Sequence, residues 1–89
     1  MKKYILNEIE QEILFLLLDS PIRINTSAIV KKLYGKFSYS SICINLYKLE
    51  KLNLIITERK NRNRFRHLTE KGIMITNHLK EIQNILKVR

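Results

Sequence analysis

Apolar residues recur along the chain with the three- and four-residue spacing of helices that bury one face. The first stripe with this spacing consists of Ile9, Ile13, Leu16 and Leu17. Asn7 predicts the N-cap of this helix, and Glu10, three residues later, would complete a capping box. Pro21 predicts its end, because a proline cannot continue the hydrogen bonding of a helix.

The first helix is apolar on more than one side. Outside the stripe, further apolar residues stand at Leu14, Phe15 and Leu18. One small core does not require so wide an apolar surface, so we expect these three residues to face a second subunit. An enlarged core within the same chain is the alternative interpretation.

A second, short helix is predicted to begin at Asn25 or Thr26. It would bury Ile29 and Leu33 on one face. We expect it to stop at Gly35, in the left-handed conformation that commonly ends a helix. A third helix follows after a brief turn.

The third helix is predicted to run from its N-cap, Ser38, to about Leu52. Its inner face consists of Ile42, Leu46 and Leu49. The opposite face is small, polar and cationic and consists of Ser40, Ser41, Ile44, Tyr47, Lys48 and Lys51. Such a face suits a DNA major groove about 12 Å wide, and we expect the first five of these residues to contact DNA. A solvated face is the alternative, although Ile44 and Tyr47 would then be apolar groups facing water.

Two short strands are predicted next, Leu54 to Arg59 and Arg64 to Thr69, around a four-residue loop. The apolar and polar alternation in the second strand is imperfect, because Arg66 shares a face with Leu68. We therefore expect a bulge that lets Leu68 reach the core.

The hairpin carries a dense run of positive charge with no acidic residue inside it. Its cationic side chains are Arg59, Lys60, Arg62, Arg64 and Arg66. Asn61 and Asn63 supply turn chemistry without diluting this charge. Each phosphate that a fixed cation neutralises releases condensed counterions, so the run predicts contact with a nucleic-acid backbone. A solvated surface turn is the alternative.

The last helix is predicted over residues 70–87, with Thr69 as its cap. It carries an apolar seam with coiled-coil spacing, Ile75, Leu79, Ile82 and Leu86. We interpret the seam as part of a dimer interface. Because it spans fewer than three heptads, packing against its own domain remains the alternative.

Positive charge is concentrated in the middle of the chain. Seventeen Lys and Arg against eight Asp and Glu give a net charge of +9. Residues 23–66 hold eleven basic residues against two acidic ones, whereas residues 1–22 carry −2 and residues 67–89 carry +2. This pattern indicates double-stranded DNA as the partner. We do not expect a membrane partner, since no apolar stretch approaches the roughly 20 residues that span a bilayer.

Other chemistry finds little support in the sequence. The single cysteine, Cys43, excludes an internal disulfide and fits a reducing compartment, so we expect a cytoplasmic protein and interpret Cys43 as a packing residue, with redox sensing as the alternative. His67 and His78 lack the ligand spacing of a metal site. No nucleophile and base converge, so we expect neither an enzyme nor a cofactor. The 89 residues predict a single domain over residues 1–89.

The order of these elements resembles a winged helix-turn-helix domain, an α+β fold that is mostly α. The resemblance is carried by residues 25–33, 49–55 and 68–72, with the sequences NTSAIVKKL, LEKLNLI and LTEKG. They are similar to the positioning helix, the exit of the recognition helix and the start of the last helix in the multiple-antibiotic-resistance (MarR) and phenolic-acid (PadR) regulator families. In length the chain resembles small archaeal and archaeal-virus regulators. Asn53 stands where these families usually have glycine, which asparagine can replace in left-handed backbone.

The resemblance implies a transcription regulator that binds a pseudo-palindrome as a homodimer. The third helix of each subunit would enter a major groove, the two-stranded wing would follow the backbone, and residues 70–89 would form the dimerisation helix. An architectural or protein-interaction module that binds DNA without sequence preference is the alternative. Neither the sequence nor the resemblance identifies an effector ligand.

Overall fold

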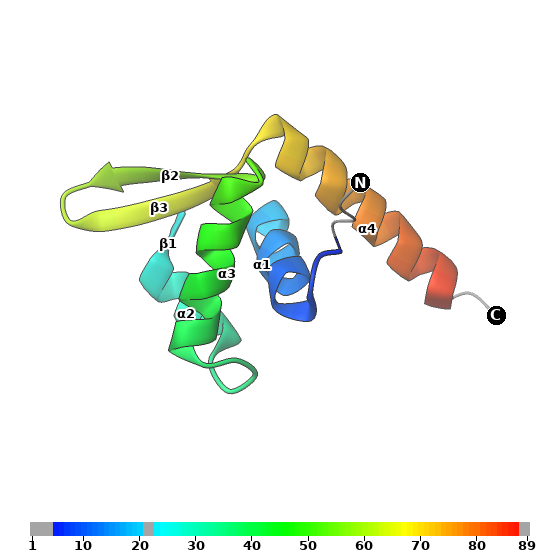
Figure 1. The fold of residues 1–89 in the computed structure, drawn as a ribbon, viewed down its shortest axis with the longest axis horizontal. Coiled ribbons are helices and arrows are strands. Elements are labelled where there is room, and N and C mark those ends of the chain that lie inside the picture. The colour runs from blue at the N-terminus through cyan, green and yellow to red at the C-terminus, as the bar shows by residue number, and fades with distance from the viewer. Residues whose placement is uncertain (1–4, 21–22, 88–89) are drawn as a thin grey trace.

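The computed structural model describes residues 5–20 and 23–87 (Figure 1). In chain order the elements are α1 (Glu8–Asp19), β1 (Ile24–Asn25), α2 (Thr26–Leu33), α3 (Tyr39–Lys51), β2 (Ile55–Lys60), β3 (Asn63–Leu68) and α4 (Glu70–Lys87). Pro21, the predicted end of the first helix, lies outside the described residues. Among those described, no helix is both long and apolar enough to cross a membrane.

The helices begin where local hydrogen bonds cap them. At α1 the capping box is confirmed: the Asn7 Oδ1 atom accepts from the Glu10 backbone N–H at 2.8 Å, and Glu10 Oε1 accepts from the Asn7 N–H at 3.0 Å. Asn25, Ser38 and Thr69 each accept a hydrogen bond from the backbone N–H three residues later. These caps place the starts of α2, α3 and α4 as predicted, with Asn25 rather than Thr26 as the cap of α2.

A left-handed residue follows α2, and another follows α3. Gly35 follows α2 with a φ of 98°, and Asn53 follows α3 with a φ of 62°. Both conformations were expected from the sequence. They turn the chain sharply after each helix, so that α3 and then the hairpin can pack back on the core.

The core lies where α1, α2, α3 and the root of the hairpin meet. Its buried apolar residues are Ile13, Leu14, Leu17, Ile24, Ile29, Leu33, Ile42, Leu46, Leu49, Leu54 and Ile55. The inner faces predicted for α2 and α3 are therefore confirmed, while Ile9 and Leu16 of α1 are only partly buried. The prediction that Leu14 faces a second subunit is wrong, because its side chain is 0% exposed. The cause is that α1 packs against α3, α4 and β3 at once.

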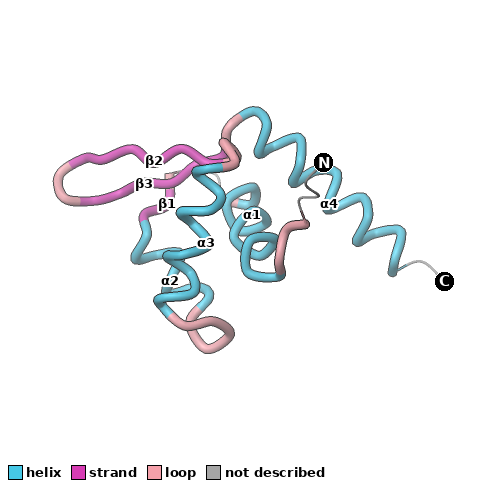
Figure 2. Tube along the Cα trace, viewed as in Figure 1, coloured by secondary structure: helices cyan, strands magenta, loops and turns pink. Residues whose placement is uncertain are grey.

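The sheet has three antiparallel strands in the order β1-β3-β2 (Figure 2). The β2 and β3 strands pair without interruption from Ile55 opposite Leu68 to Lys60 opposite Asn63. The predicted bulge is wrong, because this register already places Leu68 on the core side beside Ile55. The predicted four-residue loop is also wrong.

Only Asn61 and Arg62 connect β2 to β3. Their φ angles are 51° and 69°, which matches the mirror-image turns that suit the twist of a two-residue hairpin. The short strand β1 was not predicted, because its two residues form a strand only through their pairing with Arg66 and Phe65 of β3.

The last helix, α4, has the predicted length but two different halves. Near its start, an ideal Cβ atom on Gly72 would lie 2.0 Å from the Leu54 carbonyl oxygen, so only glycine allows this close approach. Ile75 and Leu79 then pack against the core. Beyond them the helix extends away from the body of the domain (Figure 1), and Ile82 and Leu86 are 51% and 72% exposed. The predicted seam is thus divided between the domain's own core and its surface.

Candidate nucleic-acid interface

The outer face of α3 is exposed as the sequence predicted. Ser40, Tyr47 and Lys48 lie on the surface, and Ile44 is 55% exposed although it is aliphatic. Ser41 lies at the edge of this face, half-buried, and its hydroxyl accepts a hydrogen bond from the Ser38 hydroxyl at 2.9 Å. The five residues of α3 that were predicted to contact DNA therefore share one side of the helix. Four of them lie on an open surface.

A buried polar bridge holds α3 against α1. The side-chain amide of Asn45 is 5% exposed and donates to the Ser41 carbonyl at 2.7 Å. Its Oδ1 atom accepts from Asn7 Nδ2, at the cap of α1, at 2.8 Å. Because an unpaired buried amide is costly, this bridge favours one rotation of α3 about its axis. Together with the buried Ile42, Leu46 and Leu49, it fixes which side of α3 faces outward.

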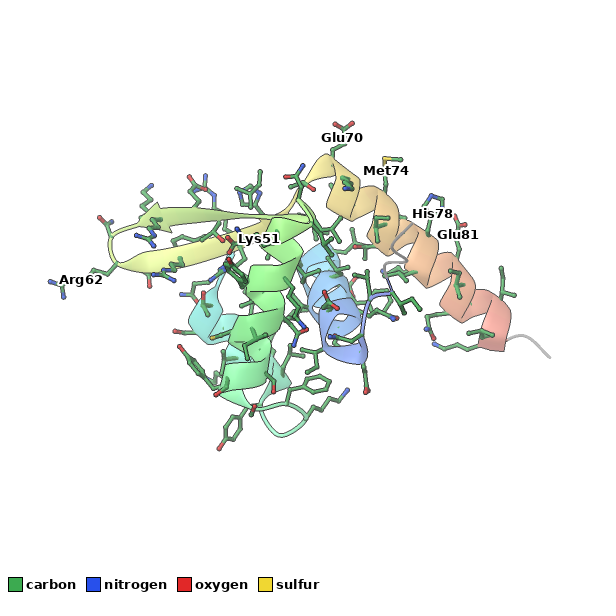
Figure 3. All side chains as sticks on the ribbon, viewed as in Figure 1. Lys51, Arg62, Glu70, Met74, His78 and Glu81 are labelled. Carbon is green, nitrogen blue, oxygen red and sulfur yellow. The ribbon has the colours of Figure 1, made fainter. Side chains whose placement is uncertain are left out.

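The wing presents its cations at the tip of the hairpin. Arg59 and Arg64 lie directly opposite each other on β2 and β3, and with Lys60 and Arg62 they are exposed. Figure 3 shows Arg62 pointing outward from the turn. Like charges directly opposite in a sheet are destabilising, so a bound anion between or beside these arginines would relieve their repulsion.

Arg66 differs from the other four cations of the run. It is 7% exposed, its guanidinium forms a salt bridge with Glu50 of α3, and its Nε atom donates to Thr26 Oγ1 at 3.3 Å. Burial lowers the pKa of Arg66, against the opposing effect of the Glu50 carboxylate, and an arginine remains charged at neutral pH after such a shift. We therefore correct the prediction for Arg66, which is an internal group of the domain rather than an exposed phosphate contact.

The two acidic residues of the central segment are both neutralised. Glu50 pairs with Arg66, and Glu58 pairs with Arg23 at 3.0 Å on the other face of the wing. Within the described part of the chain, nine cations of residues 23–66 then have no carboxylate within 4.0 Å. They are Lys31, Lys32, Lys36, Lys48, Lys51, Arg59, Lys60, Arg62 and Arg64. The positive charge of these nine side chains is therefore uncompensated.

An open, polar groove of about 520 Å³ separates α3 from the wing. The start of α2 forms one end of it, and Arg62, Asn63 and Arg64 form one wall. The opposite wall includes Tyr39 and Cys43 of α3, which the sequence reasoning did not assign to the interface. Their spacing of four residues, continued by Tyr47, was the signal that could have identified them.

Three cations near the end of α2 were also not assigned to the interface from the sequence. Lys31 and Lys32 occupy the last turn of α2, and Lys36 lies in the turn before α3. All three are exposed. They place positive charge near the start of α3, while the wing places it near the other end of that helix (Figure 1).

The exposed half of α4 forms a second, apolar surface. Ile82, Ile85 and Leu86 are each more than half exposed, and Met74 lies farther back along the helix. In Figure 3 Met74, His78 and Glu81 point away from the body of the domain.

Among the described residues, no cluster of three His, Cys, Asp or Glu side chains could hold a metal ion.

A helix-turn-helix, a hairpin beside its second helix and a closing helix together define a winged helix-turn-helix domain, which confirms the predicted fold. AF1382 from Archaeoglobus fulgidus superposes with a TM-score of 0.83 over 94% of this chain and 93% of its own, at 22% identity. MepR, a transcription regulator of the Staphylococcus aureus multidrug efflux pump MepA, gives a TM-score of 0.79 at 19% identity, covering 91% of this chain and 60% of its own. No protein-family model and no curated protein matches the sequence.

A third similar structure is the homodimeric winged helix-turn-helix DNA-binding domain of Mb0332 from Mycobacterium bovis. It gives a TM-score of 0.71 at 16% identity, over 93% of this chain and 73% of its own. At these identities the similarity establishes the fold. The chain spans nearly all of AF1382 but only about three-fifths of MepR.

Proposed function

We propose that this protein is a transcription regulator that binds double-stranded DNA sequence-specifically, as a homodimer on a pseudo-palindromic site. The observation that carries the proposal is the exposed outer face of α3 lying between two groups of cations without carboxylate partners. Cations near both ends of a helix can contact phosphates on the two edges of a groove while the helix lies inside it. The regulators among the similar structures share this fold, which supports the same use of it.

Within this proposal, α3 supplies the sequence preference. Ser40 can donate to or accept from base edges, and Ile44 offers an aliphatic group to a thymine methyl. Tyr47 and Lys48 lie one turn farther along the same side. The wing supplies affinity for any duplex through Arg59, Lys60, Arg62 and Arg64, because phosphate contacts carry no sequence information directly.

The homodimer is supported by the apolar surface on the distal half of α4. Three aliphatic side chains that are more than half exposed on one helix are more than the scattered single residues normal for a monomer surface. An apolar groove of about 730 Å³ lies beside it, with Leu6, Leu52, Ile75 and Leu79 in its lining. We propose that α4 is the dimerisation helix of a single domain. Residues 88–89, which the predicted dimerisation helix included, lie outside the described residues. Ile82, Ile85 and Leu86 would form the centre of the interface, and the half-buried Phe15 and Leu18 its margin.

A two-fold dimer of this kind presents two α3 helices to one face of the duplex. Half-sites read in this way lie about one helical turn, roughly 34 Å, apart. The target is then a pseudo-palindrome, because the protein's two-fold symmetry is reflected in its site.

The test is selection of binding sites from a random duplex pool at fixed salt, followed by affinity measurements on the selected duplex and a scrambled one. A regulator should prefer the selected duplex by about 1,000-fold or more. Equal affinity for both duplexes would identify a non-specific coating protein, and weak affinity for both would identify a protein-interaction module.

The Ile44→Ala variant tests whether α3 is the source of the preference for the selected duplex. We expect it to lower the ratio of specific to non-specific affinity roughly tenfold, within the range of about 1–3 kcal/mol for a base contact. Ile56→Ala is the matched control, because Ile56 is similarly exposed but lies on the wing, on the face away from Arg66. Equal losses on both duplexes with Ile44→Ala would assign α3 to backbone contact instead.

A further inference from the structure

One acidic side chain stands inside the cationic surface. Glu50, on the last turn of α3, lines the groove together with Arg62 and Arg64, and its side chain is 38% exposed. A carboxylate in this position repels the phosphates that the surrounding cations would attract. Its presence calls for a structural or functional reason.

The hydrogen bonds of Glu50 join α3 to both strands of the wing. A single oxygen, Oε1, accepts from Thr57 Oγ1 of β2 at 2.6 Å and from the Arg66 guanidinium of β3. Thr57 and Arg66 are themselves a cross-strand pair. One carboxylate oxygen therefore ties adjacent points on both strands to the end of α3.

Arg66 extends the connection to α2. Its Nε atom donates to Thr26 Oγ1, and the Thr26 hydroxyl in turn donates to the Arg64 carbonyl at 3.4 Å. Beyond these side chains, β1 holds the outer side of β3 by only two residues. So short a third strand gives the hairpin little support. Its root is held by the buried Leu54 and Ile55, and its other face carries the exposed Arg23–Glu58 salt bridge. On the groove side, the Glu50 network joins the strands to α3 and so bears on the angle of the wing.

We propose that Glu50 and Arg66 are positioning residues that fix the angle between the wing and α3. This inference rests on the proposed DNA-binding function. It gives a positioning role to two residues that would not themselves contact a base or a phosphate. With the angle fixed, α3 can lie in the groove only where the wing also meets the backbone, so both contacts form together at a correct site. With the angle free, the wing can follow any duplex independently of what α3 reads.

The proposal predicts effects of opposite sign for Glu50→Gln. The amide keeps the size of the side chain but removes the negative charge and weakens its bond to Arg66. Affinity for scrambled DNA should rise several-fold, because one repulsive charge has gone. The ratio of specific to scrambled affinity should fall about tenfold or more. If both affinities rise together and the ratio is unchanged, Glu50 only tunes the charge and the proposal is overturned.

Arg66 is tested by comparing Arg66→Lys with Arg66→Met. A positioning role needs the guanidinium fork, which a lysine ammonium does not reproduce. The ratio of specific to scrambled affinity should therefore fall in both variants, while the salt dependence of binding stays as in the wild type. A phosphate contact would give the reverse result: the log–log salt slope would fall by about 0.9 in Arg66→Met and be restored in Arg66→Lys. Arg23→Met is the control, because Arg23 is also a paired cation but bonds only Glu58 on the opposite face of the wing.

A measurement without DNA separates this inference from the proposed function. Residual dipolar couplings of the free protein report the orientation of the wing relative to α3. In the wild type, the couplings should fit a single orientation of the wing. In Glu50→Gln and Arg66→Lys they should fit only an average over several wing orientations, while the couplings within α1 to α3 stay unchanged. A wing that stays fixed in both variants overturns the inference, whereas a wild-type protein that does not discriminate between sequences overturns the proposed function.

Discussion

The wing and the distal half of α4 both extend beyond the core of the domain, but they expose opposite kinds of surface (Figure 1). The wing tip exposes four cations, and the end of α4 exposes Ile82, Ile85 and Leu86. Water solvates a cation well, so the wing can stay free until a polyanion approaches. Apolar surface of this extent is unfavourable in water at all times and favours continuous cover. Under the proposed function, the wing has a transient, salt-sensitive partner and α4 a permanent one.

The largest effect should follow from charging the apolar surface. We predict that Ile82→Glu combined with Leu86→Glu raises the dimer dissociation constant at least about 100-fold, or roughly 3 kcal/mol, because two carboxylates would have to be buried on association. Sedimentation velocity at micromolar concentrations measures the change. Specific DNA binding should weaken more than non-specific binding.

The control places a negative charge elsewhere on α4. Asn77→Glu alters an exposed polar position on a different side of the helix, outside the groove that contains Phe15, and should leave the dimer intact. A wild-type protein that sediments as a folded monomer, or a doubly charged variant that remains dimeric, would contradict the assignment of α4.

A smaller effect is expected from removing charge at the wing. Arg62→Ala with Arg64→Ala should lower the log–log salt slope by about 2, at roughly 0.9 for each lost phosphate contact. Dimerisation should be unaffected, since the two surfaces act separately. The measurement is binding to a scrambled duplex over a series of salt concentrations. Arg23→Ala is the control, because Arg23 is already paired with Glu58, and a slope that is the same in all three proteins would remove the wing from the DNA.

The smallest effect is expected from a substitution in the turn of the wing that changes stability and DNA binding in opposite directions. Arg62 holds a φ of 69°, a conformation that glycine adopts without strain. Arg62→Gly should therefore stabilise the fold by roughly 0.5–1 kcal/mol, which corresponds to an increase in Tm of about 2–8 °C, while it removes one phosphate contact. Thermal unfolding measures the gain. Asn63→Gly, one residue into β3, should lower Tm instead; a decrease in both variants would show that the turn is not strained.

Features that depend on neighbouring residues could be predicted from the sequence. The caps at Asn7, Ser38 and Thr69 act on N–H groups three residues away, so their side chains indicate where each helix begins. Likewise, the buried faces of α2 and α3 follow from helical spacing alone. The winged fold could be predicted because these local signals agree in their order along the chain.

Features that depend on distant partners could not be predicted. Arg66 belongs to a uniform run of cations, and its partners Glu50 and Thr26, sixteen and forty residues earlier, distinguish it from its neighbours. Leu14 appeared to be surplus apolar surface because the sequence does not show that three elements cover α1. The strand β1 carries too few residues to form a pattern and exists through its pairing with β3. In each case the missing information was which segments lie together.

The contact between Gly72 and the Leu54 carbonyl has a consequence for the target DNA. Backbone lies directly on backbone at this joint, with no deformable side chain between α4 and the root of the wing. In the proposed dimer this joint sets the direction of α4 and hence the distance between the two α3 helices. The number of base pairs between half-sites would then be determined at Gly72, and the identity of those base pairs on α3. Spacing and sequence of an operator could therefore change independently of each other.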